Sequence, residues 1–364
     1  MKRVISVALC LALMLCSVAL FASCGSKTYQ IAVVTDVGQL HDGGFNEGTY
    51  TGAKNFADKN GKTFQYYQPA NGANATDNDR VAAMRQAIKN GAEIIVAPGF
   101  LQATAMETVA KESPEVKFVF VDGWAMGLAN VTAVVYKEQE SGYMAGYAAV
   151  MDGYTKLGGT FGGGGANPAC NRFGFGYVQG AAAAAAEKGV DIEIRYSYKF
   201  GDSFSASSDL QTQISSWYTA GTEVVFACGG SMFQSVKSAA EESTSGKIIG
   251  VDVDQSNLSD RVITSAVKGL AVSVEKILGQ FYAGEWDAKL ADKASNLGAE
   301  DDATGIPFAT SKFTNFTQTQ YDALFAKIKA GEVNIIAEVP ENCNEAGWLT
   351  EAVKDNAHVT IIFE

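Results

Sequence analysis

The chain has 364 residues, 47% of them hydrophobic and only 6 of them proline, a composition typical of a globular protein rather than a disordered one. Its formal net charge is −12 at pH 7 and it has no basic cluster, which argues against nucleic acids and anionic lipid surfaces as partners. The two histidines, His41 and His358, lie at opposite ends of the sequence, which excludes a histidine-rich metal site. We expect a protein that needs neither a metal nor a cofactor.

Residues 1–23 are predicted to be a signal peptide. Basic residues at 2–3 precede an apolar run over 4–22, an order typical of a secretion signal. A transmembrane helix is the alternative, because the run approaches the ~20 residues that span a bilayer. The end of the run resembles the lipobox of bacterial lipoproteins, with Phe21 in place of the usual leucine. We expect cleavage before Cys24, and lipid on Cys24 that holds the protein at the extracytoplasmic face of the cell membrane.

Apolar runs alternate with helical stretches through the remaining, roughly 340 residues, a length that suits two domains. The runs are rich in Ile and Val, as expected for strands that helices cover on both faces. Helices are predicted over Asn78–Asn90 and Leu210–Ala220. The strands are predicted at Ile31–Val34, Thr63–Tyr67, Ile94–Ala97, Phe118–Val121, Val131–Val135, Ile192–Tyr196, Val224–Ala227 and Ile248–Val251. This alternation runs twice, which predicts two doubly wound α/β units whose strand ends face a common cleft.

The loop after the first strand, VTDVGQLHDGGFNEG, carries more polar and aromatic side chains than a turn needs. Asp36 and Asp42 have the chemistry of a catalytic acid/base pair, but their separation within a loop fixes no geometry. These aspartates can also cap helices and turns. Phe45 offers a flat face to a ring, and Asn46, Asp36 and Asp42 can hydrogen-bond polar edges. We interpret the loop as a recognition surface.

A second polar loop, with Asp252 and Asp254, follows the last predicted strand. If it faces Asp36 and Asp42 across the cleft, the four carboxylates repel phosphates and other carboxylates. An ionised carboxylate only accepts hydrogen bonds, so the cleft favours a neutral ligand rich in N–H and O–H donors. Sugars and nucleosides meet this condition and nucleotides do not.

Motifs for phosphate, calcium and hydrolysis are approached but not matched. The segment at 61–63 lacks the partner glycine of a P-loop, and 174–180 is one residue too long for GxGxxG. The four glycines at 162–165 are expected to form a tight loop rather than an anion nest. The stretch 252–263 lacks the glycine and the final glutamate of a calcium loop, and the sequence contains no GxSxG.

Three cysteines, Cys170, Cys228 and Cys343, remain once the signal peptide and Cys24 are set aside. One disulfide among them is possible. Because the three include no CxxC pair, we favour buried free thiols.

Six segments, taken in order, resemble the basic membrane protein family: VTDVGQLHDGGFNEG, KFVFVDG, ESGYMAGYAA, TEVVFACGG, IIGVDVDQ and VITSAVKG. This is the purine nucleoside receptor type of substrate-binding lipoprotein that serves ABC transporters. The similarity extends from Ile31 to Leu270. It implies a binding protein rather than an enzyme, with the type I periplasmic-binding fold, in which two α/β lobes joined by three hinge crossings close on a ligand.

From the resemblance we expect a monomer with an N-terminal lobe of residues 28–136 and 262–300. The C-terminal lobe is expected to comprise residues 137–261 and 301–364. The hinge crossings are expected near Val135–Lys137, Asp260–Ile263 and Asp301–Ile306.

The resemblance also implies roles for residues of the first lobe. Asp36 matches the aspartate that meets the purine edge. Phe45 matches the ring that stacks on the base, within the motif Asp42-Gly43-Gly44-Phe45-Asn46, where Gly44 replaces the usual serine. Asp122 matches a further aspartate on the pocket side.

In the second lobe, Phe204 is the expected second stacking ring, with Phe200 as the alternative. Asp252 and Lys268 are expected to hold the ribose hydroxyls. Lys268 would also neutralise a buried aspartate, unless it is simply an exposed lysine after a strand. Gly229 or Gly230 is expected to let backbone amides approach the ligand.

The expected function is capture of a nucleoside, with a purine as the expected base, and its delivery to an ABC permease. A sugar-binding lipoprotein of an ABC importer is an alternative in the same class. An extracytoplasmic nucleoside hydrolase is an alternative in another class. The departures from the family pattern at Gly44 and over 167–173 leave the base open and do not exclude a non-nucleoside ligand.

Overall fold

The computed structural model describes residues 28–364 apart from 38, 341–342, 344 and 346. The predicted signal peptide and Cys24 lie outside the described residues. Within the described ranges, no helix combines the length and the apolar character needed to cross a membrane.

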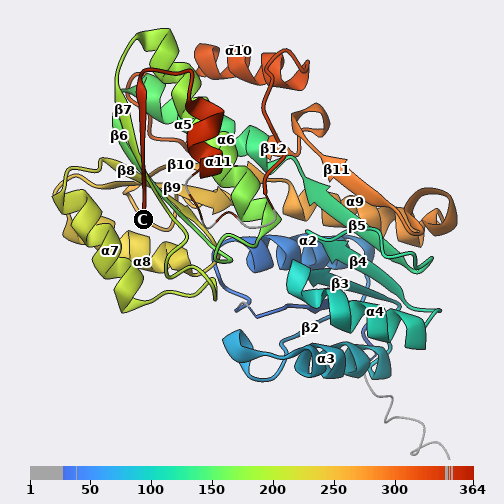
Figure 1. The fold of residues 1–364 in the computed structure, drawn as a ribbon. Coiled ribbons are helices and arrows are strands. Elements are labelled where there is room, and N and C mark those ends of the chain that lie inside the picture. Colours follow the sequence, from blue (N-terminus) through green and yellow to red (C-terminus); the bar gives the residue numbers. More distant parts are fainter. Residues whose placement is uncertain (1–27, 38, 341–342, 344, 346) are drawn as a thin grey trace, which may run out of the picture.

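Two β-sheets form the cores of two lobes (Figure 1). The first sheet is parallel throughout and has the order β11-β5-β4-β3-β1-β2. Its strands are β1 (Ile31–Val34), β2 (Phe64–Tyr67), β3 (Ile94–Pro98), β4 (Lys117–Val121), β5 (Val131–Tyr136) and β11 (Ala294–Leu297). The helices on its two faces are α2 (Phe45–Asn60) with α9 (Leu270–Tyr282), and α3 (Asp77–Lys89) with α4 (Ala103–Glu112). Strand β1 shows why both faces are covered, because Val33 packs into the α2–α9 side and Ala32 into the α3–α4 side.

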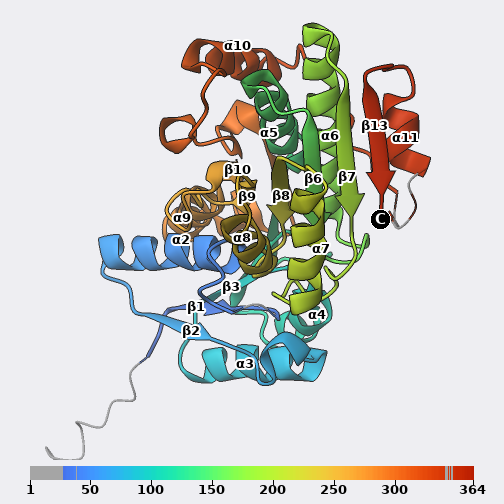
Figure 2. The ribbon, with the colours of Figure 1, turned by 90° about the vertical axis from the view of Figure 1, so that its left-hand side faces the viewer.

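The second sheet has the order β12-β10-β9-β8-β6-β7-β13, and only the β10–β12 pair is antiparallel. Its strands are β6 (Lys156–Phe161), β7 (Ile192–Ser197), β8 (Val224–Cys228), β9 (Lys247–Asp252), β10 (Val262–Lys268), β12 (Thr304–Gly305) and β13 (Val359–Phe363). Its helices are α5 (Glu138–Asp152) with α6 (Pro168–Lys188) on one face and α7 (Ser208–Thr219) with α8 (Met232–Glu242) on the other. Figure 2 shows α10 (Gln318–Lys329) and α11 (Gly347–Val353) on the outside of this lobe, with β13 at the sheet edge. Short 3₁₀ or π turns lie at Gly72–Asn74, Phe100–Gln102, Trp286–Leu290, Ala299–Asp301 and Phe308–Thr310.

All eight predicted strands are present, and their ends differ from the prediction by at most one residue. The two predicted helices correspond to α3 and α7. Five strands were missed: β6, β10, β11, β12 and β13. Strand β6 has the sequence KLGGTF, and it was not predicted because glycine is uncommon inside strands. A Cβ at Gly158 would lie 3.1 Å from the Trp217 ring, so the tight packing of α7 on the sheet requires a small residue there.

The chain passes between the lobes after β5, after β10 and between β11 and β12. The predicted crossing at Asp260–Ile263 is therefore wrong. Residues 262–268 form β10, which pairs with β9 in the second sheet, so the chain returns to the first lobe only near Gly269.

Helices α5 and α6 pack backbone against backbone through glycines. A Cβ at Gly176 would lie 2.1 Å from the Gln139 carbonyl oxygen, and one at Gly146 would lie 2.1 Å from that of Tyr177. The glycine-rich stretch at 174–180 is thus a helix contact rather than a phosphate loop. This contact holds the first turn of α5, which follows the first hinge crossing, against α6.

Candidate functional site

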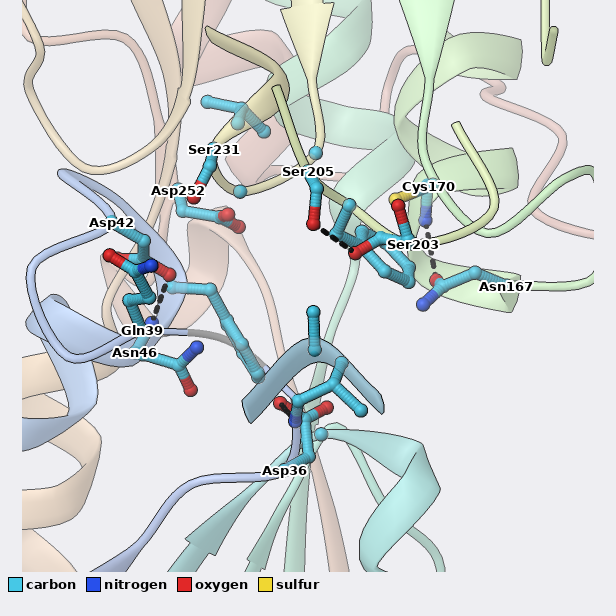
Figure 3. Close-up of a pocket in the computed structure, with 18 of the residues that line it drawn as sticks. Asp36, Gln39, Asp42, Asn46, Asn167, Cys170, Ser203, Ser205, Ser231 and Asp252 are labelled. Carbon is cyan, nitrogen blue, oxygen red and sulfur yellow. Dashed lines mark hydrogen bonds between the residues drawn. The ribbon is translucent and has the colours of Figure 1, made fainter. Parts of the chain in front are cut away.

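A cavity of about 570 Å³ lies between the carboxyl ends of the two sheets and is lined from both lobes (Figure 3). Every residue predicted to touch the ligand lines it: Asp36, Asp42, Phe45, Asn46, Asp122, Phe204, Gly229, Gly230, Asp252 and Lys268. The short loops after the strands therefore converge on one site.

In the first lobe the site forms at the switch point of the sheet, between β1 and β3. Asp36 follows β1, and Gly99 follows β3 with a φ of +99°. A Cβ at Gly99 would lie 2.1 Å from Asp36 Oδ2, so only glycine leaves room for this carboxylate. The topology and one glycine place Asp36 at the cavity wall.

Asp42 binds the first amides of α2. Its carboxylate accepts hydrogen bonds from the backbone N–H groups of Gly44 (2.9 Å), Asn46 (3.0 Å) and Glu47 (3.2 Å). Burial raises the pKa of Asp42, and these hydrogen bonds partly offset the rise. The capping interpretation is confirmed for Asp42, whose main effect is to fix Phe45 and Asn46 at the wall. Figure 3 shows Asp42 and Asn46 side by side, away from Asp36.

The second lobe repeats the arrangement between β6 and β8. The Phe204 ring lies over the glycine loop after β6, because a Cβ at Gly162 would lie 2.5 Å from ring atoms and one at Gly163 would lie 3.1 Å from them. The four-glycine run is therefore a tight loop that seats an aromatic ring. Phe200, the alternative second ring, is 38% exposed and is not among the residues that line the cavity.

Lys268, at the end of β10, lies at the floor of the cavity with its side chain only 2% exposed. Its Nζ atom is 2.5 Å from Asp122 Oδ2, 3.5 Å from Asp252 Oδ1 and 3.6 Å from Glu138 Oε1. Asp122 follows β4 of the first sheet and Asp252 ends β9 of the second, so the ammonium group links the two lobes. The alternative of an exposed lysine is wrong.

Burial controls the protonation of this cluster. It raises the pKa of Asp122 to about 6 against the attraction of Lys268, and it does the same for Asp252. Burial alone would lower the pKa of Lys268, but the three carboxylates outweigh it, so the pKa lies above the usual value. Lys268 is therefore a permanent cation, and the raised pKa values of Asp122 and Asp252 lie in the weakly acidic range.

Aromatic rings surround the same ammonium group. Lys268 Nζ is 4.7 Å from the centroid of the Phe45 ring, 5.4 Å from that of Tyr136 and 5.7 Å from that of Phe173. Cation–π attraction stabilises a cation in this position. Phe45 is thereby connected to the charged floor as well as to the wall.

Three residues of the cavity have left-handed backbone conformations, which residues other than glycine rarely adopt. Their φ angles are +58° at Asp122, +56° at Phe204 and +68° at Asp252. Strained backbone of this kind gathers at ligand sites, where surrounding structure holds it. Here it directs two carboxylates and one ring into the cavity.

The sequence model of the Bmp family, described as the PnrA-like substrate-binding proteins of ABC transporters, matches residues 29–342. The chain belongs to this family. A nucleoside-binding protein of an ABC transporter from Lactococcus lactis is 29% identical over 350 residues, which cover 85% of this chain and 95% of the relative. An uncharacterized lipoprotein from Pyrococcus horikoshii is 26% identical, over 77% of this chain and 69% of the relative. The crystal structure of a solute-binding protein of an ABC transporter from Aeropyrum pernix has a similar fold, with a TM-score of 0.74 and 21% identity over 90% of this chain and 98% of that one.

Membership in the PnrA-like family settles the class of the protein. It is an extracytoplasmic substrate-binding protein of an ABC transporter, with a small-molecule ligand and a permease as partners, and it is not an enzyme. The hydrolase alternative is thereby excluded. The predicted type I periplasmic-binding fold, with two parallel-sheet lobes, is confirmed.

Sequence reasoning missed several parts of the site. Phe173 lines the cavity from α6, and Glu138 lies behind Lys268 with Arg172 as its partner. The position of Glu138 beside a predicted crossing was the only signal available for it. The prediction that Asp254 adds its charge to the cleft is wrong. Asp254 does not line the cavity and instead accepts hydrogen bonds from Ser256 N and Thr310 Oγ1.

The three cysteines of the described chain are buried free thiols, as predicted. Cys170 and Cys228 line the cavity, whereas Cys343 is not among its lining residues. Burial raises the pKa of Cys343 to about 11 and that of Cys228 well above its usual value. The thiols of Cys228 and Cys343 therefore act as small apolar side chains at neutral pH.

Proposed function

We propose that the protein captures a nucleoside, with a purine as the expected base, and delivers it to its permease. One observation carries the proposal: two phenyl rings, Phe45 and Phe204, reach a single cavity from opposite lobes. Stacking between rings recognises the flat face of any base.

The charge of the lining argues for a neutral ligand. Among the described residues that line the cavity, four are aspartates and Lys268 is the sole lysine or arginine. A phosphate would therefore meet an excess of negative charge. We assign Asp36 and Asn46 to the polar edge of the base, and Asp252 and Lys268 to the hydroxyls of the ribose.

The polar atoms of the wall fit a ligand that donates hydrogen bonds. Within the described residues, Asn46 Oδ1 and Asp122 Oδ1 are buried and have no hydrogen-bond partner. A buried acceptor without a partner costs free energy, so a ligand that supplies N–H or O–H groups gains affinity there. Gly229 and Gly230 leave the backbone open to the same ligand.

A ligand held between the rings contacts both lobes at once. It therefore stabilises the closed arrangement relative to an open one, and closure is the state that the permease receives. We place the lobes at residues 28–136 with 270–300 and at residues 137–268 with 301–364, and we propose that the protein acts as a monomer.

Native mass spectrometry of protein purified without denaturation tests the proposal. We expect an added mass equal to that of a nucleoside, which is lost on unfolding and restored by adding that nucleoside to refolded protein. An added mass equal to that of a sugar or a nucleotide would contradict the proposal.

Affinity should depend on pH through Asp122 and Asp252. Their pKa values of about 6 lie in the range where protonation removes a hydrogen-bond acceptor for the ligand. We expect constant affinity above pH 7 and a fall of at least about tenfold between pH 6 and pH 5. Titration calorimetry across this range measures it, and an affinity that stays level down to pH 5 would contradict the assignment.

We also propose that lipid on Cys24 anchors the protein. The basis is the lipobox-like ending of the signal segment and a relative named as a lipoprotein. Mass spectrometry of the N-terminus of the membrane-bound protein tests this, and we expect a chain that begins at Cys24 and carries the added mass of the lipid. A chain that keeps residues 1–23, or one that begins at Cys24 without added mass, would contradict the proposal.

A further inference from the structure

Glu138 is a fully buried carboxylate that lies behind the cavity floor. It is the first residue of α5, directly after the crossing at Lys137. Its Oε2 atom accepts a hydrogen bond of 2.7 Å from Arg172 Nε on α6, and its Oε1 atom is 3.6 Å from Lys268 Nζ. Glu138 is not among the residues that line the cavity, so it can act on a ligand only through its neighbours.

The rest of the same turn binds the other two crossings. Glu140 Oε2 accepts hydrogen bonds from Ala299 N at 2.7 Å and Thr304 Oγ1 at 2.6 Å. Ser141 Oγ donates to the Val267 carbonyl at 2.6 Å and accepts from Gly305 N at 2.9 Å. The turn at 138–141 therefore holds the second and third crossings while it continues the first.

We propose that Glu138, held by Arg172, is a positioning residue that fixes the Lys268 ammonium at the cavity floor and sets the charge that the two floor aspartates present to the ligand. The turn at 138–141 thereby connects the hinge to the binding site. The position of the Lys268 ammonium group is fixed from three sides, because it contacts carboxylates of the first lobe, the second lobe and the hinge.

The charge balance gives Glu138 a measurable effect. Burying Asp122, Asp252 and Glu138 beside Lys268 and Arg172 leaves an excess of one negative charge. Glu138 repels both aspartates and so contributes to their raised pKa values. The groups that face the two aspartates are Asp42 ahead of α2, Tyr136 of β5, Glu138 of α5, Arg172 of α6, Cys228 of β8 and Lys268 of β10.

The first test needs no ligand. Carbon-13 NMR of aspartate-labelled protein, with Asp122→Asn and Asp252→Asn used to assign the signals, should give midpoints near pH 6 in the wild type. In Glu138→Gln both midpoints should fall by about half a pH unit or more, because a repelling charge is removed. Glu138→Asp keeps the charge and should stay near the wild type, as should Glu187→Gln, whose exposed side chain bonds to Tyr147.

Arg172→Gln should shift the aspartate midpoints in the opposite direction. This test remains valid even if Glu138→Gln does not fold. It removes the cation that compensates Glu138, so both midpoints should rise. Equal midpoints in the wild type and Glu138→Gln, or a fall in Arg172→Gln, would overturn the proposal. So would a Glu138→Asp variant that shifts as far as Glu138→Gln.

The second test measures the affinity for a nucleoside, and it therefore rests on the proposed function. With guanosine at pH 7.5, Glu138→Gln should bind about tenfold more weakly than the wild type, and its loss of affinity at low pH should begin at a lower pH. If the wild type binds no nucleoside, the proposed function fails, while the NMR midpoints still decide the role of Glu138.

Discussion

Lys268→Met is expected to lower the free energy of unfolding by about 3–5 kcal/mol and to abolish ligand binding. Removing one partner of a buried ion pair leaves the other charges buried without compensation, which is the costly case. Here three carboxylates, those of Asp122, Asp252 and Glu138, would face one another across the space that the ammonium group occupied. Urea unfolding at pH 7.5 measures the effect.

The pH dependence of that loss separates charge from packing. Without Lys268 the pKa values of the two aspartates rise further above their unfolded values, so their unfavourable contribution is present at neutral pH and disappears as the pH falls through those values. The destabilisation should therefore be smaller at pH 5. Lys312→Met is the matched control, because its side chain is 38% exposed and its partner Asp260 is fully exposed, and it should cost at most about 1 kcal/mol. A loss of the same size at both pH values would contradict the electrostatic account.

Phe204→Ala is expected to weaken nucleoside binding by about 10- to 100-fold, since stacking of a base on an aromatic ring contributes about 1–3 kcal/mol. Phe204 is half-buried and lies over the glycine loop after β6, so its removal uncovers the second-lobe wall rather than opening the core. Titration calorimetry with guanosine measures the loss. The unfolding free energy should change much less than the affinity.

Phe200→Ala provides a control within the same loop. Phe200 has the same side chain and the same left-handed backbone, with a φ of +63°, but it does not line the cavity. Its substitution should leave the affinity unchanged within about twofold. If Phe204→Ala binds as tightly as Phe200→Ala, the ligand does not stack in the second lobe, and a sugar becomes the better assignment.

Runs of Ile and Val were enough to predict the strands that helices bury on both faces. Strand β10 shows where this signal ends. It reads VITSAVK, and its buried hydroxyls are satisfied by tertiary partners, as when Gln255 N donates to Ser265 Oγ at 3.1 Å and Thr264 bonds to Ser311. No local sequence pattern indicates such partners, so strand β10 was missed. The hinge crossing was consequently predicted before this strand instead of after it.

The candidate site was predictable in its list of residues but not in its geometry. The segments shared with the family contain every predicted wall residue except Phe204, because these segments lie at strand ends that face the cleft. They did not show that Asp42 caps α2 or that Asp254 turns away. The pairing of Glu138 with Arg172 joins the first turns of two helices, so it becomes visible only once the helices are packed.

The nucleoside site is tested most directly by titration calorimetry. The protein used begins at Gly25 and is refolded to remove any ligand that it carries from expression. Adenosine, guanosine and inosine would be compared with AMP, ribose and galactose. We expect one or more purine nucleosides to bind with one-to-one stoichiometry, while AMP and the free sugars do not bind. Binding of AMP as tight as that of adenosine would contradict the charge argument, and binding of the sugars alone would contradict the nucleoside site.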